Sequence, residues 1–514
     1  MLVFEWVLAM LLGAVLLSAI ANRIKVPYPV LLAVGGAAMA LLPHGPQLEL
    51  DPQLALALFV APVLLDAAYD TSLRDLKEAW FTVGLLVIVA VGVTAAAVAV
   101  VAHWLVPAMP WAAAVALGAI VAPPDAGAAT AVLRQVRLPL RLMTVLEGES
   151  LLNDATALLI YRIAVTAVVG GMSGWHLTAY AALVVPLSVL LGAVLAMIYG
   201  RLLAQISNVP TNILMQFVGT FGLWILAERS GLSAILTVVT FGIVLARLTA
   251  ESMPARIRVP SFAVWETIVF VLNVLAFVIV GLQLRPILGR LSITQRMDYL
   301  AVAAAVLTTC ILIRIAVVMP YNAVYRRYYR KHGLPHVSIL YRPTVATGAI
   351  IAWSGMRGIV TLAAALALPE HFPYRDLITL CAFSVVLGTL LIQGLTIRPL
   401  LAVLPLRMDD TLDIEMNIAR CEALRAGLAA IDGDKSPSAN ALRAEYQESL
   451  RRATEDPKHR LPRYLAADEV RRRAVIASRH SLAVLRSNGK IGDAAYHSLE
   501  EEFDWLELAT GGRE

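Results

Sequence analysis

Residues 147–154 spell Glu-Gly-Glu-Ser-Leu-Leu-Asn-Asp within a largely apolar run that extends from 143 to 169. A run of that length is long enough to cross a membrane as a helix, which takes about 20 residues. A charged side chain at membrane depth costs several kcal/mol and persists only where it has a partner or a task. Three carboxylates and an amide so close together therefore predict a functional site inside a transmembrane helix.

The spacing of these polar residues places them on two neighbouring helix faces. Glu147, Ser150 and Asp154 share one face, and Glu149 and Asn153 form an adjacent row. A hydroxyl and a carboxylate directed to one point are hard oxygen ligands of the kind that suits Na⁺ or Li⁺. The carboxylate can also hold a proton in place of the metal ion. One group that binds either ion is the minimal device for cation–proton antiport.

The composition of the whole chain agrees with a membrane protein. Of its 514 residues 59% are hydrophobic and only 15% are charged, and the mean hydropathy is +0.74. A water-soluble protein of this size needs more charge to cover its surface, so a soluble α/β enzyme is excluded. The net charge of +5 is distributed over loops and gives no support for nucleic-acid binding.

Charged residues are concentrated towards the carboxyl end, which divides the chain into two predicted domains. Residues 1–405 hold 25 Lys and Arg and 17 Asp and Glu, whereas the much shorter stretch 406–514 holds 17 and 20. We expect a transmembrane antiporter domain followed by a small helical cytosolic tail. Within the tail, helical fragments are predicted at 416–430 and 466–485.

The apolar runs predict an all-α polytopic membrane protein of about 13 transmembrane helices. The predicted spans are 3–21, 27–43, 53–70, 80–104, 111–132, 143–169, 176–204, 211–228, 231–247, 263–282, 300–320, 344–368 and 376–400. The connections on one side of these spans contain sixteen Lys and Arg, and those on the other side contain five. We expect a protein of a bacterial inner membrane, and the positive-inside rule then predicts a periplasmic N-terminus and a cytoplasmic tail.

Two of the predicted spans are interrupted in mid-membrane. The fifth contains residues 122–127 (Ala-Pro-Pro-Asp-Ala-Gly) and the twelfth residues 353–358 (Trp-Ser-Gly-Met-Arg-Gly). Proline removes backbone donors and glycine loosens the turn, so both helices should break. Spans seven apart run in opposite directions, which is typical of an inverted-repeat transporter with a midplane site, where Asp125 and Arg357 compensate the charges of the half-helix ends. The alternative is that the glycines of the second motif only permit close helix packing.

These motifs resemble those of a known family. Asp125, followed by Gly-Glu-Ser-Leu-Leu-Asn-Asp at 148–154 and Gly-Met-Arg-Gly at 355–358, is similar to the pattern of the sodium/proton exchangers of the first monovalent cation:proton antiporter family, in particular its bacterial branch. Residues 59–67 (Phe-Val-Ala-Pro-Val-Leu-Leu-Asp-Ala) resemble the family's third-span motif, which ends in a functional carboxylate. The likeness covers nearly all of residues 1–400. It implies crossed broken helices in a core domain that moves against the dimerisation domain of a homodimer.

The resemblance also implies roles for individual residues. Asp154 would be the carboxylate that carries the cation or the proton. Ser150 and Asp66 would be auxiliary ligands of the transported Na⁺. Asn153 would mark electroneutral exchange, in contrast to relatives with two adjacent aspartates.

Two further implications concern the support and the selectivity of this ion site. Glu149 would form a structural salt bridge, either with Arg314 or with Arg357. Pro124 departs from the family, which has Thr before the fifth-span Asp, so that hydroxyl is lost while the backbone carbonyls remain as ligands. The departure leaves K⁺/H⁺ exchange on the same fold open as an alternative.

We therefore predict a secondary antiporter that exchanges Na⁺ or Li⁺ for H⁺, one for one, and is driven by the proton gradient. The sequence contains no nucleotide-binding loop, His/Cys metal cluster or nucleophile triad, so we expect neither enzymatic activity nor a cofactor other than the transported ions. Membrane lipid and a second copy of the chain are the expected partners. An intramembrane aspartyl protease acting through Asp125 and Asp154 is disfavoured, because such enzymes resemble one another in a Gly-x-Gly-Asp element that this sequence lacks.

Overall fold

The computed structural model consists of helices and their connections. The residues that it describes are 2–24, 26–42, 51–125, 140–170, 174–332, 344–405, 411–455, 466–488, 490, 496, 499–500 and 502–506. No strand occurs among these residues, which confirms the all-α prediction. The chain divides into two compact units, residues 1–408 and residues 409–514.

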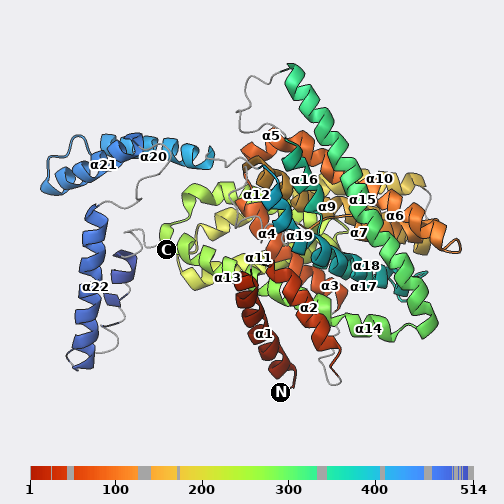
Figure 1. Cartoon of the computed structure of the whole chain (residues 1–514). Coiled ribbons are helices and arrows are strands. Elements are labelled where there is room, and N and C mark those ends of the chain that lie inside the picture. The colour runs from red at the N-terminus through yellow and green to blue at the C-terminus, as the bar shows by residue number, and fades with distance from the viewer. Residues whose placement is uncertain are drawn as a thin grey trace. The chain divides into compact units, whose positions relative to one another are not determined.

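The first unit contains helices of membrane-spanning length (Figure 1). The helices of its first half are α1 (Leu2–Ile24), α2 (Tyr28–Ala40), α3 (Pro52–Ala55), η1 (Leu56–Val60), α4 (Ala61–Asp70), α5 (Leu73–Gly84), η2 (Leu85–Ala90), α6 (Val91–Leu105), α7 (Trp111–Val121) and α9 (Leu140–Gly170). Those of its second half are α10 (Gly174–Leu203), α11 (Val209–Arg229), α12 (Ala234–Ser252), α13 (Ala255–Leu282), α14 (Leu284–Gly289), α15 (Ile293–His332), α16 (Val345–Trp353), α17 (Ile359–Leu366), α18 (Arg375–Thr389), η4 (Leu390–Gly394) and α19 (Leu395–Val403).

Each of the predicted spans has a helical counterpart in the described residues. Eight helices are long and apolar enough to cross a membrane, and four shorter apolar helices and the α16–α17 pair match the remaining spans. The exact number of membrane crossings stays a prediction. Two features were not predicted: the short helix α14, and the length of α15, whose 40 residues correspond to about 60 Å.

Side-chain caps decide where several helices begin. Ser72 Oγ accepts a hydrogen bond from the Asp75 amide at 3.3 Å, so α5 begins at Leu73, seven residues before the predicted span. Thr344 and Thr347 form a reciprocal capping box at the start of α16. Hydropathy alone marks the apolar part of a span, whereas these caps add a polar turn before it.

Among the residues that the structure describes, three spans contain a π-helical segment: η1, η2 and η4. A π-helical turn is uncommon and is found frequently at functional sites, where it shifts the side chains that follow it. Segment η1 lies in the third span, just before α4, which contains Asp66. The hydropathy of these stretches gives no sign of the change in helix type.

Helices α2 and α13 approach each other closely through glycine. A Cβ on Gly36 would overlap the carbonyl of Val278, and a Cβ on Gly281 would overlap the carbonyl of Ala33. In a bilayer, helices associate through such close contact and not through the burial of apolar surface, because lipid tails are as apolar as leucine. A larger residue at either glycine would force the two helices apart.

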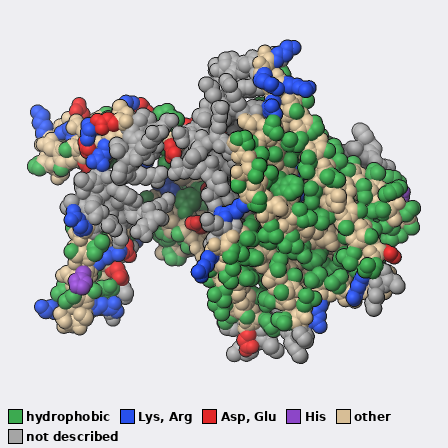
Figure 2. All heavy atoms as spheres, in the orientation of Figure 1, with side chains coloured by type: hydrophobic (Ala, Val, Ile, Leu, Met, Phe, Trp, Pro, Cys, Tyr) green, Lys and Arg blue, Asp and Glu red, His purple; other side chains and the backbone are tan. Residues whose placement is uncertain are grey.

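The surface of the first unit is apolar. Figure 2 shows hydrophobic side chains over most of its visible face, with Lys and Arg mainly at the edges of that face. Large side chains that are 60–77% exposed include Leu12, Ile88, Trp104, Leu214 and Leu312. A soluble monomer rarely exposes a continuous apolar surface of this extent, whereas lipid covers it at no cost. The first unit is therefore a membrane domain.

The second unit contains α20 (Thr411–Ala430), α21 (Pro437–Glu455) and α22 (Ala466–Ser487). Both predicted fragments fall within helices, and α21 is an additional one that begins at a proline. The amide of Asn417 donates to the Ala453 carbonyl at 2.7 Å in a buried contact, which joins α20 to α21. The tail is thus helical, as expected.

Candidate ion-exchange site

The two interrupted spans meet at their breaks. Residues 122–125 after α7 are not helical, and residues 354–358 separate α16 from α17. The amide of Asp125 donates to the carbonyl of Met356 at 2.7 Å. The predicted break is confirmed in the twelfth span. In the fifth span it is confirmed for residues 122–125, where the described part of the motif ends. The rest of the fifth-span motif, Ala126 and Gly127, lies outside the described residues.

Each break contributes a charged side chain to a helix end at the other break. Arg357 Nε donates to the carbonyl of Val121, the last residue of α7, at 3.1 Å, and Arg357 Nη1 donates to the carbonyl of Gly355. A helix C-terminus has unpaired carbonyls and a partial negative charge, which the guanidinium offsets. Conversely, a Cβ on Gly358, the residue before α17, would overlap Asp125 Oδ2, so this carboxylate lies at the positive end of α17. This geometry matches the compensation that the motifs predict.

Asn153 connects the ion-binding helix to the first break. It is fully buried on α9, and its Nδ2 donates to the carbonyl of Pro124 at 2.6 Å. Its amide therefore reaches the broken span and does not donate to Asp154. Within the described part of the chain, Asn153 Oδ1 is buried with no hydrogen-bond partner. An orphaned buried carbonyl oxygen is costly unless water or a cation binds it, so this atom is a candidate cation ligand.

Asp154, the next residue on α9, is partly exposed. Its neighbour Asn153 is hydrogen-bonded to Pro124, the residue before Asp125, so the two aspartates lie in the same region of the crossing. Ser150 lies one turn earlier on the same face of α9 and is also partly exposed. Two carboxylates that repel each other in a membrane domain favour the binding of one positive charge between them, whether a cation or a proton.

Glu149 forms its salt bridge with Arg314 of α15. Arg314 Nη1 and Nη2 lie 2.7 and 2.9 Å from the two carboxylate oxygens, and both side chains are buried. Nη2 also donates to the carbonyl of Ile351 in α16 at 3.0 Å. The geometry answers the question that the sequence left open, since Arg357 donates to backbone carbonyls instead. The pair joins α9, α15 and α16 beside the crossing.

Asp66 lines a cavity of about 50 Å³ whose walls come from α4 and from α10 to α13. Polar groups around it include the Tyr69 hydroxyl, which lies 2.7 Å from Thr249 Oγ1, and Arg258, which donates to the Ala250 carbonyl at 3.3 Å. The cavity places Asp66 near the α12–α13 connection. A direct part for Asp66 in the cation site stays a prediction.

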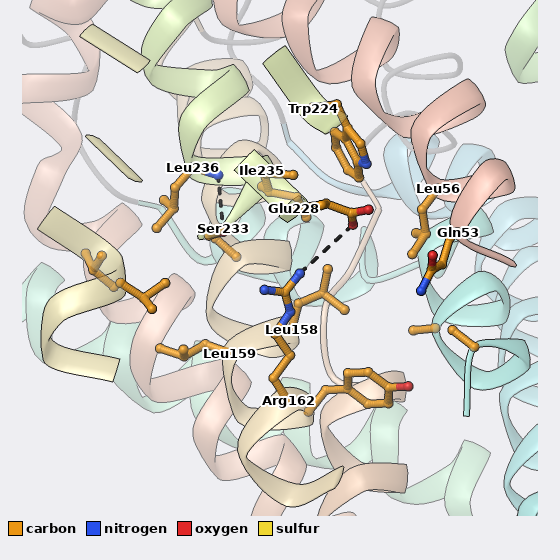
Figure 3. Close-up of a pocket in the computed structure, with 17 residues that line it drawn as sticks. Gln53, Leu56, Leu158, Leu159, Arg162, Trp224, Glu228, Ser233, Ile235 and Leu236 are labelled. Atoms are coloured by element: carbon orange, nitrogen blue, oxygen red, sulfur yellow. Dashed lines mark hydrogen bonds and ion pairs between the residues drawn. The ribbon is translucent and has the colours of Figure 1, made fainter. Parts of the chain in front are cut away.

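A larger cavity of about 180 Å³ lies between α9, α11 and α12 (Figure 3). Its wall includes Ala155, the residue that follows Asp154. Arg162 of α9 and Glu228 of α11 point towards each other across it, with their charged atoms 4.0 Å apart. Gln53 and Ser233 supply further polar groups to its wall.

The two cavities lie near opposite ends of the same helices. Gln53 at the larger cavity and Asp66 at the smaller one are thirteen residues apart along one span, or about 20 Å. Glu228 and Gln216 are separated in the same way along α11 by about 18 Å. Cavities are therefore found towards both ends of the helices that pack beside α9.

Some of these residues carry no clear signal in the sequence. Glu228 stands beside Arg229 at the end of an apolar run, where charges are ordinary. Thr389 accepts a hydrogen bond from the Arg357 amide at 3.1 Å, yet it is one of many threonines within apolar spans. Arg162 is the exception, because an arginine within a membrane span calls for a partner. Its partner only becomes evident in three dimensions.

The comparison with protein families shows which family the chain belongs to. A sequence profile of the family described as "Sodium/hydrogen exchanger, transmembrane" matches residues 7–403. The chain belongs to this family. The match includes every helix of the exchanger that contributes to the crossing, the Glu149 salt bridge and the two cavities.

Two curated relatives show how similar the exchanger is to characterised proteins. A protein of Bacillus pumilus, named "Sodium, potassium, lithium and rubidium/H(+) antiporter", is 28% identical over 523 residues, which cover 97% of this chain and 77% of the relative. The "Low-affinity Na(+)/H(+) antiporter NhaS1" of Synechocystis is 30% identical over 435 residues, which cover 83% and 79%.

Among solved structures, the exchanger is similar to the sodium proton antiporter MjNhaP1 of Methanocaldococcus jannaschii. The TM-score is 0.60 at 17% identity, and the match covers 79% of this chain and 99% of the other. This similarity confirms the predicted antiporter fold.

Proposed function

We propose that this exchanger moves Na⁺ and H⁺ in opposite directions across the membrane by binding them in alternation at Asp154. One observation carries the proposal: beside Asp154, the buried Oδ1 of Asn153 has no partner among the described residues. A carboxylate and a free amide oxygen are hard oxygen ligands suited to Na⁺. Ser150, Asp125 and the Pro124 carbonyl would complete the cation site.

The proposed coupling follows from the cost of an uncompensated charge. Asp154 lies close to Asp125 within a membrane domain, so an unloaded, doubly charged site is unfavourable in a closed, dry state. Only the forms loaded with Na⁺ or with H⁺ then change access from one side to the other. With one carrier carboxylate the exchange is one for one and electroneutral. It takes its energy from the proton gradient and needs neither a cofactor nor an enzymatic reaction.

The proposed orientation rests on the distribution of basic residues. Sixteen Lys and Arg on one side of the membrane domain against five on the other support an orientation with the richer side in the cytoplasm, and we expect the membrane to be a bacterial inner membrane. The N-terminus is then periplasmic, and residues 406–514 form a cytosolic tail. The larger cavity, near the α11–α12 connection, is on the periplasmic side. By family resemblance we expect a homodimer embedded in membrane lipid.

The test uses everted membrane vesicles with an imposed proton gradient and a pH-sensitive dye. Na⁺, Li⁺ and K⁺ are added in turn to vesicles with wild type, with Asp154→Asn, and with Glu78→Gln as a control at an exposed carboxylate of α5. Wild type and the control should dissipate the gradient on addition of Na⁺, and Asp154→Asn should not, although it remains folded. Exchange retained by Asp154→Asn would overturn the proposal.

K⁺/H⁺ exchange is a second candidate, and two observations favour it. Pro124 provides no side-chain oxygen where, by family resemblance, threonine is usual. The name of the Bacillus pumilus relative includes potassium. A response of the vesicles to K⁺ alone would establish this candidate in place of Na⁺/H⁺ exchange.

A further inference from the structure

The wall of the larger cavity comes within one residue of Asp154, the proposed carrier of the cation or the proton. Its wall includes Ala155, Leu158 and Arg162, which follow Asp154 along α9 for two turns, or about 12 Å. A volume of about 180 Å³ holds several water molecules, since a single water needs only about 10–15 Å³ on this measure. The cavity is therefore large enough to admit a small cation together with some of its water as far as Ala155, the residue after Asp154.

The charged pair in this cavity differs from the buried pair beside the crossing. Arg162 and Glu228 are 35% and 30% exposed and their closest charged atoms are 4.0 Å apart. Glu149 and Arg314 are almost fully buried and joined by two short hydrogen bonds. A long contact between partly exposed charged groups contributes little to stability and exchanges partners readily. Glu228 is thus free to take another cation in place of the guanidinium.

Arg162 has a second contact that holds it in place when Glu228 is otherwise engaged. Its Nη1 donates to the carbonyl of Leu232 in the α11–α12 connection at 3.1 Å. The guanidinium therefore stays at the cavity whether or not it is paired with Glu228. Its charge competes with any incoming cation for the same carboxylate.

We propose that Glu228 is an entry ligand that attracts the cation into this cavity, and that Arg162 is a positioning residue that limits its occupancy by competition. The ligand is a small monovalent cation, and the inference rests on the proposed exchange at Asp154. The two residues then act in opposite directions on cation affinity. A purely structural ion pair would give a different result: loss of either partner would cause the same defect.

The predicted changes apply to one face of the membrane. Glu228→Gln should raise the Na⁺ concentration for half-maximal exchange roughly two- to fivefold, as expected for one partly exposed charge interaction. Arg162→Gln should lower it by a similar factor, and Arg162→Lys should behave like wild type. Under the proposed orientation the shifts occur when Na⁺ is added to right-side-out vesicles and are absent when it is added to everted vesicles.

The experiment measures half-saturation by Na⁺ in both vesicle types for the three variants, for wild type and for Glu78→Gln, an exposed carboxylate that does not line the cavity. Thermal unfolding of each purified variant shows whether it is folded. Opposite shifts for Glu228→Gln and Arg162→Gln on one face support the inference. Equal losses of Na⁺ affinity in both variants, or shifts of the same size on both faces, overturn the inference. In that case Na⁺-dependent exchange by wild type leaves the proposed function intact. Absence of Na⁺-dependent exchange in wild type overturns both.

Discussion

The amide nitrogen of Asp125 lies 2.7 Å from the carbonyl oxygen of Met356, so the two interrupted spans are hydrogen-bonded backbone to backbone. A helix break inside a membrane leaves polar backbone groups without water, and each unpaired group costs several kcal/mol. Here part of that cost is offset, because the backbone N–H of one break is hydrogen-bonded to a backbone carbonyl of the other. The same contact brings Asp125 to the start of α17 and Arg357 to the end of α7. The polarity of the ion site is therefore a consequence of how the crossing is stabilised.

Gly358→Ala tests the fit of Asp125 at this crossing. The new Cβ would overlap Asp125 Oδ2, so the carboxylate must move away from α17. We expect Na⁺-dependent exchange to fall roughly tenfold or more, because a displacement of about 1 Å at a binding group is enough for such a loss. Exchange in vesicles and thermal unfolding of the purified protein check the result.

Gly92→Ala is the matched control for that substitution. Gly92 lies inside α6, and a Cβ there meets no atom of the described residues within 4 Å. The variant should exchange like wild type and gain about 0.5–1 kcal/mol of stability from the lower flexibility of alanine. If Gly358→Ala also exchanged like wild type, the position of Asp125 against α17 would not matter for transport.

Arg314→Met tests the buried salt bridge with Glu149. Removal of one partner leaves a buried charge uncompensated, which costs about 3–5 kcal/mol. The double variant Glu149→Leu/Arg314→Met removes both charges and should recover much of that loss. Thermal unfolding of wild type, both single variants and the double variant measures the coupling. A double variant no more stable than Arg314→Met alone would show that the ion pair is not the source of the effect.

The sequence was sufficient to predict features that depend on local chemistry. The prolines and glycines of 122–127 and 353–358 predicted the breaks, because these residues disturb a helix wherever they occur. Asp125 and Arg357 predicted the compensation of the helix ends, because a helix end carries a partial charge that a side chain of opposite sign offsets. The choice between Arg314 and Arg357 as the partner of Glu149 was not predictable. It depends on how α15 is rotated against α9, across 165 residues of chain.

The cavities could not be predicted from a hydropathy pattern either. An apolar run reports that a helix is in the membrane, but it does not report which neighbour each side chain meets. Arg162 was recognisable as a charge that needs a partner, whereas Glu228 appeared to be an ordinary residue at a span end. Only the packing of α9 against α11 brings them to 4.0 Å.

The tail offers a prediction on pH. Hydrogen bonds from Arg451 and from Arg452 lower the pKa of Glu448 to about 2 from its usual 4.5. A lowered pKa in the folded state means that the stabilisation is complete above pH 4.5 and is lost as the pH falls towards 2. Glu448→Gln should therefore speed amide hydrogen exchange in α21 slightly at neutral pH. It should also remove the loss of protection in α21 that wild type shows as the pH falls from 4.5 towards 2. Hydrogen-exchange mass spectrometry of the full chain measures this.

The control for the tail is Glu422→Gln. Glu422 is an exposed glutamate of α20 with its own arginine one turn away, Arg425. Its replacement should leave hydrogen exchange in α21 unchanged. Equal effects of the two substitutions on α21 would mean that the tail responds to net charge and not to the Glu448 contacts.

Pro124→Thr tests how the first break selects its cation. Threonine supplies a hydroxyl beside Asp125, and its carbonyl is still available to Asn153 Nδ2, which lies 2.6 Å from the Pro124 carbonyl. An additional hard oxygen ligand in a compact site favours the smaller ion, so the ratio of Na⁺ to K⁺ exchange should rise several-fold. The measurement compares half-saturation by Na⁺, Li⁺ and K⁺ in everted vesicles, with Pro124→Ala to separate the gain of the hydroxyl from the loss of the proline ring. If Pro124→Thr and Pro124→Ala changed the ratio equally, backbone flexibility and not the hydroxyl would control selectivity at this break.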